Sequence, residues 1–112
     1  MEITASEQSG ATLVKITGSM DALTCDETQA FFDTQINSTQ VRLVVDLSRV
    51  DYLSSAGLRV LLSALKSARQ RGGDLYLVGV QDSVHQVLAL AGFVSIFKIF
   101  PMATEAFEAF PS

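Results

Sequence analysis

The chain has 112 residues, of which 48% are apolar and 18% charged, and its formal net charge at pH 7 is -4. This length and apolar fraction predict one compact domain with its own core, and they exclude a disordered or linker protein. Apart from Arg69 and Arg71, the basic residues are dispersed along the chain, so nucleic acid is not an expected partner.

The cysteine content and the first residues bear on the cellular compartment. A single cysteine, Cys25, cannot form an internal disulfide, and no basic segment followed by an apolar one opens the chain. The longest apolar runs are interrupted by charge or glycine within about ten residues, whereas a membrane-spanning helix needs roughly 20. We therefore expect a cytoplasmic, soluble domain without direct membrane insertion.

The first residues predict a β-hairpin. Residues 2–7 and 11–17 have the composition of two short strands, and Ser9-Gly10 between them is a turn signal. Gly18 is expected to end the second strand.

A helix is predicted after this hairpin, over about residues 25–37. Thr24 followed three residues later by Glu27 has the spacing of a capping box, with acids in the first turn. The apolar side of this helix would carry Cys25, Phe31, Phe32 and Ile36.

The centre of the chain predicts a buried strand and a second helix. Residues 41–47 are apolar on both faces apart from Arg42 and Asp46, which is typical of a central strand. After a turn at Ser54-Ser55, apolar residues recur at helical spacing until Gly72-Gly73 ends the helix: Leu58, Leu61, Leu62, Leu65 and Ala68.

The pattern repeats once more. Residues 75–80 predict a strand, and Ser83 with Gln86 three residues later predicts a capped helix that Gly92 ends. The apolar positions of that helix are Val84, Val87, Leu88 and Ala91.

The last residues predict a short strand over 94–100, broken by Pro101, and a terminal helix capped by Thr104. That helix would bury Ala106, Phe107 and Phe110. Strands alternating with helices after an opening hairpin predict an α/β domain with a mixed sheet and right-handed crossovers.

Most catalytic chemistry lacks the residues it needs. One histidine and one cysteine without ligand spacing exclude the usual metal sites, and Gly72-Gly73 follows a helix instead of forming a phosphate loop. A hydrolase would need His85 as the base for Ser54 or Ser55, yet no Gly-x-Ser-x-Gly elbow is present. We expect no cofactor, no metal and no enzymatic activity.

Cys25 at a helix start fits either a redox-sensitive thiol or, as we favour, a small core residue.

Ser54 and Ser55 are the residues of interest, because they lie where the central strand turns into the second helix. A serine at a helix start either caps an orphan backbone N–H or stands in solvent as a modification site. The residues alone leave both roles open for both serines.

The segment from Val45 to Leu61 closely resembles the signature of STAS domains, specifically the bacterial anti-sigma factor antagonists. Gly18-Ser19-Met20-Asp21 resembles the Gly-x-Leu-Asp turn of that family, and Gly72-Gly73-Asp74-Leu75 its helix-to-strand turn. The resemblance implies a single STAS domain over residues 1–112. Its sheet would be mixed, with four to five strands, and about four helices would pack mainly on one face.

The resemblance also implies a regulatory function. Members of the family bind an anti-sigma factor that has serine kinase activity, which frees the sigma factor. The kinase then phosphorylates one serine at the helix start, the complex dissociates, and a PP2C-type phosphatase resets the switch. The family's Asp-Ser-Ser-Gly-Leu aligns with Ser54-Ser55-Ala56-Gly57-Leu58, so the acceptor falls on Ser55. Ser54, which replaces the frequent aspartate, is a competing acceptor.

The partner-facing surface is expected around this turn, with Arg59 as an exposed cation and with Ala56 and Gly57 keeping the surface low. The residues assigned to it are Met20, Asp21, Ser54, Ser55, Ala56, Gly57 and Arg59. An alternative function is a STAS scaffold or regulatory subunit of a signalling complex or transporter, without serine phosphorylation.

Overall fold

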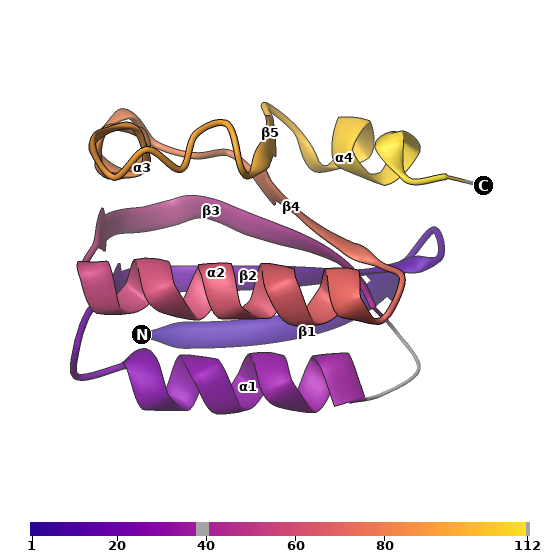
Figure 1. The fold of residues 1–112 in the computed structure, drawn as a ribbon, viewed down its shortest axis with the longest axis horizontal. Helices are drawn as coiled ribbons and strands as arrows, with labels where there is room; N and C mark the ends of the chain where they lie inside the picture. Colours follow the sequence, from indigo (N-terminus) through magenta and orange to yellow (C-terminus); the bar gives the residue numbers. More distant parts are fainter. Residues whose placement is uncertain (38–40, 112) are drawn as a thin grey trace.

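The computed structural model describes residues 1–37 and 41–111, which form five strands and four helices (Figure 1). In chain order the elements are β1 (Glu2–Gln8), β2 (Ala11–Met20), α1 (Cys25–Asn37), β3 (Arg42–Leu53), α2 (Ser55–Gln70), β4 (Asp74–Val78), α3 (Asp82–Leu90), β5 (Lys98–Phe100) and α4 (Ala103–Ala109). The predicted order of strands and helices is confirmed. None of the described helices is long and apolar enough to cross a membrane.

The predicted hairpin is confirmed, but its second strand is longer than expected. Ser9 and Gly10 both adopt positive φ angles, 52° and 80°, which lets two residues reverse the chain. The prediction that Gly18 ends β2 is wrong, because the strand continues to Met20. Gly18 has a φ of 109° and lies next to a register shift between β2 and β3, so it accommodates an irregularity inside the strand.

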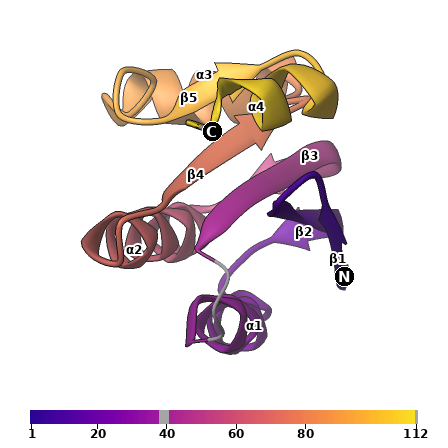
Figure 2. The same cartoon turned by 90° about the vertical axis from the view of Figure 1, so that its right-hand side faces the viewer.

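The sheet has the order β1-β2-β3-β4-β5, with β1 antiparallel to β2 and the other neighbours parallel. Because the parallel strands follow one another across the sheet, right-handed crossovers place α1, α2 and α3 on the same face. Figure 2 shows α1 and α2 side by side, with α4 well away from both. The predicted α/β fold, with a mixed sheet and helices mainly on one face, is confirmed.

Alternating side chains of the strands build a core on each face. Leu43 and Val45 of β3 belong to a large cluster with residues of α1, α2 and α3, whereas Val44 between them belongs to a smaller one. The smaller cluster contains Tyr76 of β4 and Ala106 of α4. The helix that follows the last strand therefore covers the face that the crossover helices leave open.

Three predicted side-chain caps are not formed, at Thr24, Ser83 and Thr104. The N-caps of α3 and α4 are Gln81 and Met102, and neither makes a side-chain capping bond, so the caps predicted at Ser83 and Thr104 are wrong. The hydroxyl of Ser83 donates instead to the backbone oxygen of Asp51 at 3.1 Å. The hydroxyl of Thr24 likewise contacts Ser19 O, at 3.2 Å, in the turn before α1. A tertiary partner therefore takes the Ser83 hydroxyl, and the preceding turn takes that of Thr24.

The predicted strand over 94–100 is also shorter than expected, because only Lys98–Phe100 pairs with β4. The amides of Ile96 and Phe97 donate to the oxygen of Phe93, at 3.1 and 3.3 Å, and form a turn. Phe97 is buried. A short apolar run packs against the core equally well as a turn, which its composition does not distinguish from a strand.

Candidate functional site

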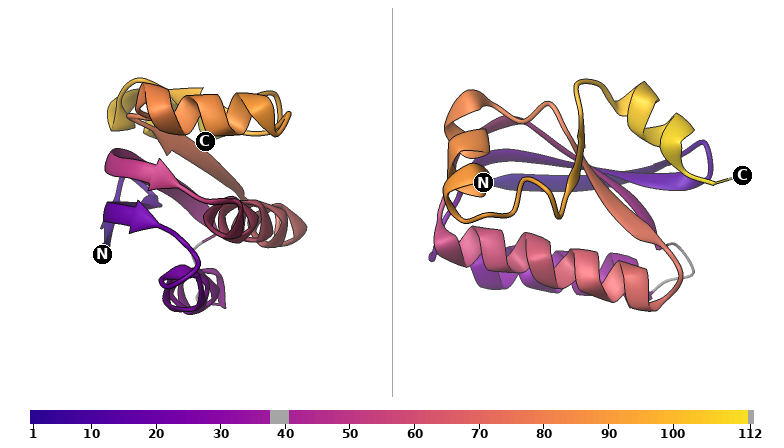
Figure 3. Two further views of the ribbon diagram at one scale, coloured as in Figure 1. Left: turned by 90° about the vertical axis from the view of Figure 1, so that its left-hand side faces the viewer. Right: turned by 45° about the horizontal axis from the view of Figure 1, so that its top comes forward.

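The candidate site lies at one edge of the sheet, where the parallel strands have their carboxyl ends. The chain leaves β2, β3 and β4 at this edge and enters α1, α2 and α3, so three helix starts lie at the same end of the molecule (Figures 1 and 3). In open parallel sheets, loops at this edge are the usual place for binding functions. The two serines at the start of α2 belong to this edge.

Ser54 is the N-cap of α2, with extended backbone angles of φ -81° and ψ 169°. Its Oγ accepts a hydrogen bond from the Gly57 amide at 3.1 Å and donates one to the backbone oxygen of Met20 at 3.0 Å. The Ser54 amide donates to the same oxygen at 2.8 Å. Ser54 therefore caps the helix and joins its start to the end of β2.

Gly57 allows α2 to approach β2 this closely. A Cβ atom at this position would lie 2.7 Å from Met20 O and 2.9 Å from Leu53 Cδ1, closer than side chains tolerate. Gly57 is buried, and Met20 is only 1% exposed. The side chain of Met20 thus lies in the core, and these two residues position the expected partner surface from beneath without forming its exposed part.

Ser55 differs from its neighbour in every respect that matters for modification. It is the first residue of α2, its side chain is exposed, and its hydroxyl makes no hydrogen bond to the residues that the structure describes. Ala56 is half-buried beside it. The structure therefore separates the serines into one engaged cap and one accessible hydroxyl.

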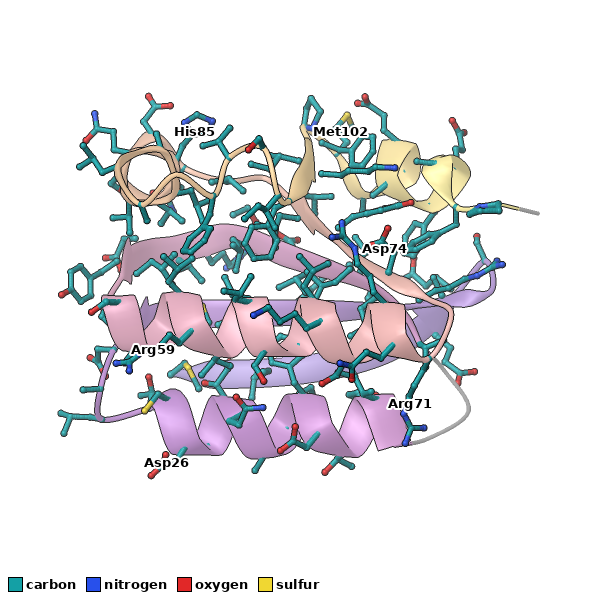
Figure 4. The ribbon with its side chains drawn as sticks, viewed as in Figure 1. Asp26, Arg59, Arg71, Asp74, His85 and Met102 are labelled. Carbon is teal, nitrogen blue, oxygen red and sulfur yellow. The ribbon has the colours of Figure 1, made fainter. Side chains whose placement is uncertain are left out.

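Arg59 lies one helical turn after Ser55 and is exposed. It lines an open groove between α1 and α2 together with Cys25, Asp26 and Ala56. Figure 4 shows Arg59 and Asp26 near the starts of their helices, at the same end of the molecule. The predicted exposed cation is present at this site.

Asp21 serves mainly to shape the turn between β2 and α1. Its Oδ1 accepts hydrogen bonds from the amides of Leu23, at 3.0 Å, and Thr24, at 3.2 Å. This turn holds Leu23 in solvent, 94% exposed, and Tyr52 near the end of β3 is 54% exposed. Sequence reasoning did not find these two residues, because periodicity assigns apolar side chains to the core. The one feature of the sequence that could have indicated their exposure is that Leu23 and Tyr52 lie next to the turns at Asp21 and Ser54.

Cys25 and His85 do not join the serines in a catalytic arrangement. Cys25 is half-buried, and its Sγ donates to the oxygen of Ala22 at 3.3 Å. His85 is exposed on α3 and points away from α2 (Figure 4). Within residues 1–37 and 41–111, no three His, Cys, Asp or Glu side chains group in a way that could hold a metal ion.

Comparison with known proteins relates this arrangement to one family. The model of the STAS domain matches residues 2–106. The BtrV protein of Bordetella bronchiseptica, named as an anti-sigma factor antagonist, is 34% identical over 110 residues, which cover 98% of this chain and 95% of BtrV. The anti-sigma F factor antagonist of Paenibacillus polymyxa is 29% identical over 91% of this chain and 86% of its own length.

Solved structures agree on the fold. An anti-sigma factor antagonist from Thermotoga maritima superposes with a TM-score of 0.89 at 24% identity, covering 95% of this chain and 92% of that one. Unphosphorylated SpoIIAA superposes with a TM-score of 0.82 at 15% identity, covering 96% and 94%. The chain therefore belongs to the STAS domain family and is related to the bacterial anti-sigma factor antagonists.

Proposed function

We propose that this protein is a cytoplasmic anti-sigma factor antagonist controlled by phosphorylation of Ser55. In the unphosphorylated form it binds an anti-sigma factor with serine kinase activity and thereby releases the sigma factor. A PP2C-type phosphatase returns the phosphorylated form to the binding form. The protein acts as a binding module, and its partners supply the catalysis.

One observation carries this proposal. Of two adjacent serines at the start of α2, Ser54 uses its hydroxyl twice, toward Gly57 N and Met20 O, whereas the Ser55 hydroxyl is exposed and makes no hydrogen bond to described residues. A kinase needs an accessible hydroxyl, and modification of Ser54 would remove the cap of α2. The arrangement favours Ser55 as the acceptor.

The modification reaction is a simple group transfer. The Ser55 oxygen loses its proton and forms a bond to the γ-phosphorus of ATP, and the bond from that phosphorus to the β-phosphate oxygen breaks to release ADP. The phosphatase breaks the serine–phosphate ester with water and releases inorganic phosphate. Both catalytic centres belong to the partners.

Electrostatics explains how such a switch would spare the fold and break the complex. A phosphate adds roughly -1.5 to -2 charges at neutral pH. At a helix N-terminus the unpaired backbone amides and the helix dipole tolerate that charge, so the domain should stay folded. Asp51 is exposed at the end of β3 and Asp26 at the start of α1, so the added charge falls in an acidic neighbourhood. Burying it against a partner would cost desolvation and repulsion.

The test compares binding by a charge mimic with binding by a matched control. The partner is first captured from native cells with Ser55→Ala as bait, which cannot be phosphorylated at that position, and is then purified. Ser55→Asp should weaken binding of that anti-sigma factor at least about tenfold, with a melting temperature within about 2 °C of wild type. Gln70→Glu adds the same charge at the far end of α2 and should bind normally.

Equal binding by Ser55→Asp and wild type would contradict the proposal, and so would equal weakening by Gln70→Glu. The scaffold alternative predicts that neither substitution matters and that no serine at this turn is phosphorylated. A solved sulfate transporter family protein superposes with a TM-score of 0.76 at 24% identity, which reflects the shared fold alone. We therefore keep the antagonist as the single proposal.

A further inference from the structure

We infer that phosphorylated Ser55 pairs with Arg59 of the same helix, so that modification also withdraws Arg59 from the partner. This inference rests on the proposed function, because it takes Ser55 as the acceptor. It adds a second component to the switch: besides introducing negative charge, phosphorylation neutralises the cation that the unmodified surface presents.

Helix geometry brings the two side chains together. Positions i and i+4 are neighbours on a helix surface, with Cβ atoms about 5–6 Å apart. Helical side chains lean toward the N-terminus, so the residue at i+4 covers the turn that contains residue i. Figure 4 shows the Arg59 guanidinium beside the first turn of α2. Ser55 and Arg59 are both exposed, so a phosphate on Ser55 lies within reach of Arg59 without rearrangement of the backbone.

Arg59 is available for this pairing. In the part of the chain that the structure describes, it forms neither a hydrogen bond nor an ion pair. Arg69, near the other end of the same helix, is in contrast engaged: its Nε donates to Asp74 Oδ1 at 3.1 Å and its Nη2 to Ile96 O at 3.3 Å. The start of α2 thus carries an uncommitted guanidinium, the group best suited to bind phosphate oxygens in pairs.

The acids around the site oppose the phosphate and give Arg59 its importance. Asp26 on α1 lines the same groove as Arg59, and Asp51 at the end of β3 and Asp21 before α1 lie at the same edge of the sheet. A carboxylate close to Ser55 would make a dianion there less favourable. Lys66, which also lines the groove, lies 11 residues after Ser55, or about 16 Å along the helix, too far to compensate.

The pairing changes the charge that the surface around Arg59 presents to the partner. In the unmodified protein Arg59 can bind a carboxylate of the anti-sigma factor, and in the modified protein its charge is directed to Ser55. Replacing Arg59 should therefore weaken the unmodified complex and reduce the ratio between unmodified and modified affinities.

The experiment installs phosphoserine at position 55 during translation, so that no kinase is needed, and follows its ³¹P resonance through a pH titration. Wild type, Arg59→Gln and Lys66→Gln are compared, because the two substitutions remove the same charge from the same helix. We expect Arg59→Gln to raise the second pKa of the phosphoserine by about half a unit or more, and Lys66→Gln to leave it nearly unchanged. Arg59→Lys keeps the positive charge, so its phosphoserine should have a second pKa close to that of wild type.

No change with Arg59→Gln would overturn the inference, as would equal changes for the two substitutions, which would indicate only a distant charge effect. Both replaced residues are exposed, so the variants should fold, and their melting temperatures confirm this. The two proposals fail separately. A kinase that leaves Ser55 unmodified contradicts the proposed function but does not affect this titration, whereas an absent ion pair leaves phosphorylation of Ser55 intact.

Discussion

The two ends of helix α2 are built alike but leave different groups exposed. At each end a glycine lets the chain approach another backbone segment closely: Gly57 approaches Met20, the last residue of β2, and Gly73 approaches Val41, which directly precedes β3. Each contact is accompanied by a backbone hydrogen bond, from Ser54 N to Met20 O at 2.8 Å and from Asp74 N to Val41 O at 3.2 Å.

The side chains around these anchors differ. Beyond the end of α2, Tyr76 stacks on Phe110 with ring centroids 4.2 Å apart, and Arg42 lies over the Phe110 ring at 5.9 Å. Burial, reinforced by the Asp74 carboxylate, raises the pKa of Tyr76 above its ordinary value. The aromatic and cationic groups at that end contact their own chain, whereas the start of α2 leaves Ser55, Arg59 and the neighbouring Leu23 exposed. The start of α2 is therefore held firmly by its backbone contacts while its side chains remain exposed, and this combination suits the binding of a partner.

The largest expected effect comes from filling the space at the two anchoring glycines. A Cβ at Gly73 would lie 2.1 Å from Val41 O, and one at Gly57 would lie 2.7 Å from Met20 O. Gly57→Ala and Gly73→Ala should each lower the free energy of unfolding by about 1–3 kcal/mol, the second by more. Urea unfolding measures both.

Gly72 provides the matched control, because it has a φ of 84° but no atom within 4 Å of an added Cβ. Gly72→Ala should cost only the strain of a left-handed backbone, about 1 kcal/mol. If the three alanine variants lose the same stability, the close contacts do not anchor the helix and the similarity between its ends is wrong.

A smaller effect is expected at the cap. Ser54→Ala removes the hydrogen bonds to Gly57 N and Met20 O and should cost about 1 kcal/mol, within the usual range for an N-cap. Ser54→Asp keeps an acceptor at the cap and should retain most of this stability. A Ser54→Ala protein as stable as wild type would show that the cap contributes nothing.

Sequence patterns predicted the framework well, because spacing carries that information. The Ser9-Gly10 turn, the leucines of α2 and the apolar residues of β3 are local signals, and the hairpin and crossover helices followed from them. The failures arose where tertiary contacts decide. Ser83 donates to Asp51, 32 residues away in the chain, and so does not cap α3. Residues 94–97 form a turn that places Phe97 in the core, although their composition resembles a strand.

The contrast between local signals and tertiary contacts also applies to Ser54 and Ser55. Their place at the start of a helix was evident from the sequence, but the division of roles came only from alignment with the family. In the structure Ser54 caps α2 through the Gly57 amide three residues later, and it also donates to the backbone oxygen of Met20, 34 residues away, a contact that no local pattern encodes. The exposure of Leu23 and Tyr52 likewise depends on how the loops fold.

The central claim is that Ser54 holds the helix while Ser55 carries the switch, and site-resolved phosphorylation tests it most directly. Wild type, Ser54→Ala and Ser55→Ala are incubated with the captured anti-sigma factor kinase and ATP, and phosphopeptides are mapped by mass spectrometry. We predict one phosphate on Ser55 in wild type and in Ser54→Ala, and none in Ser55→Ala. Stoichiometric phosphorylation of Ser55→Ala at Ser54 would contradict the account.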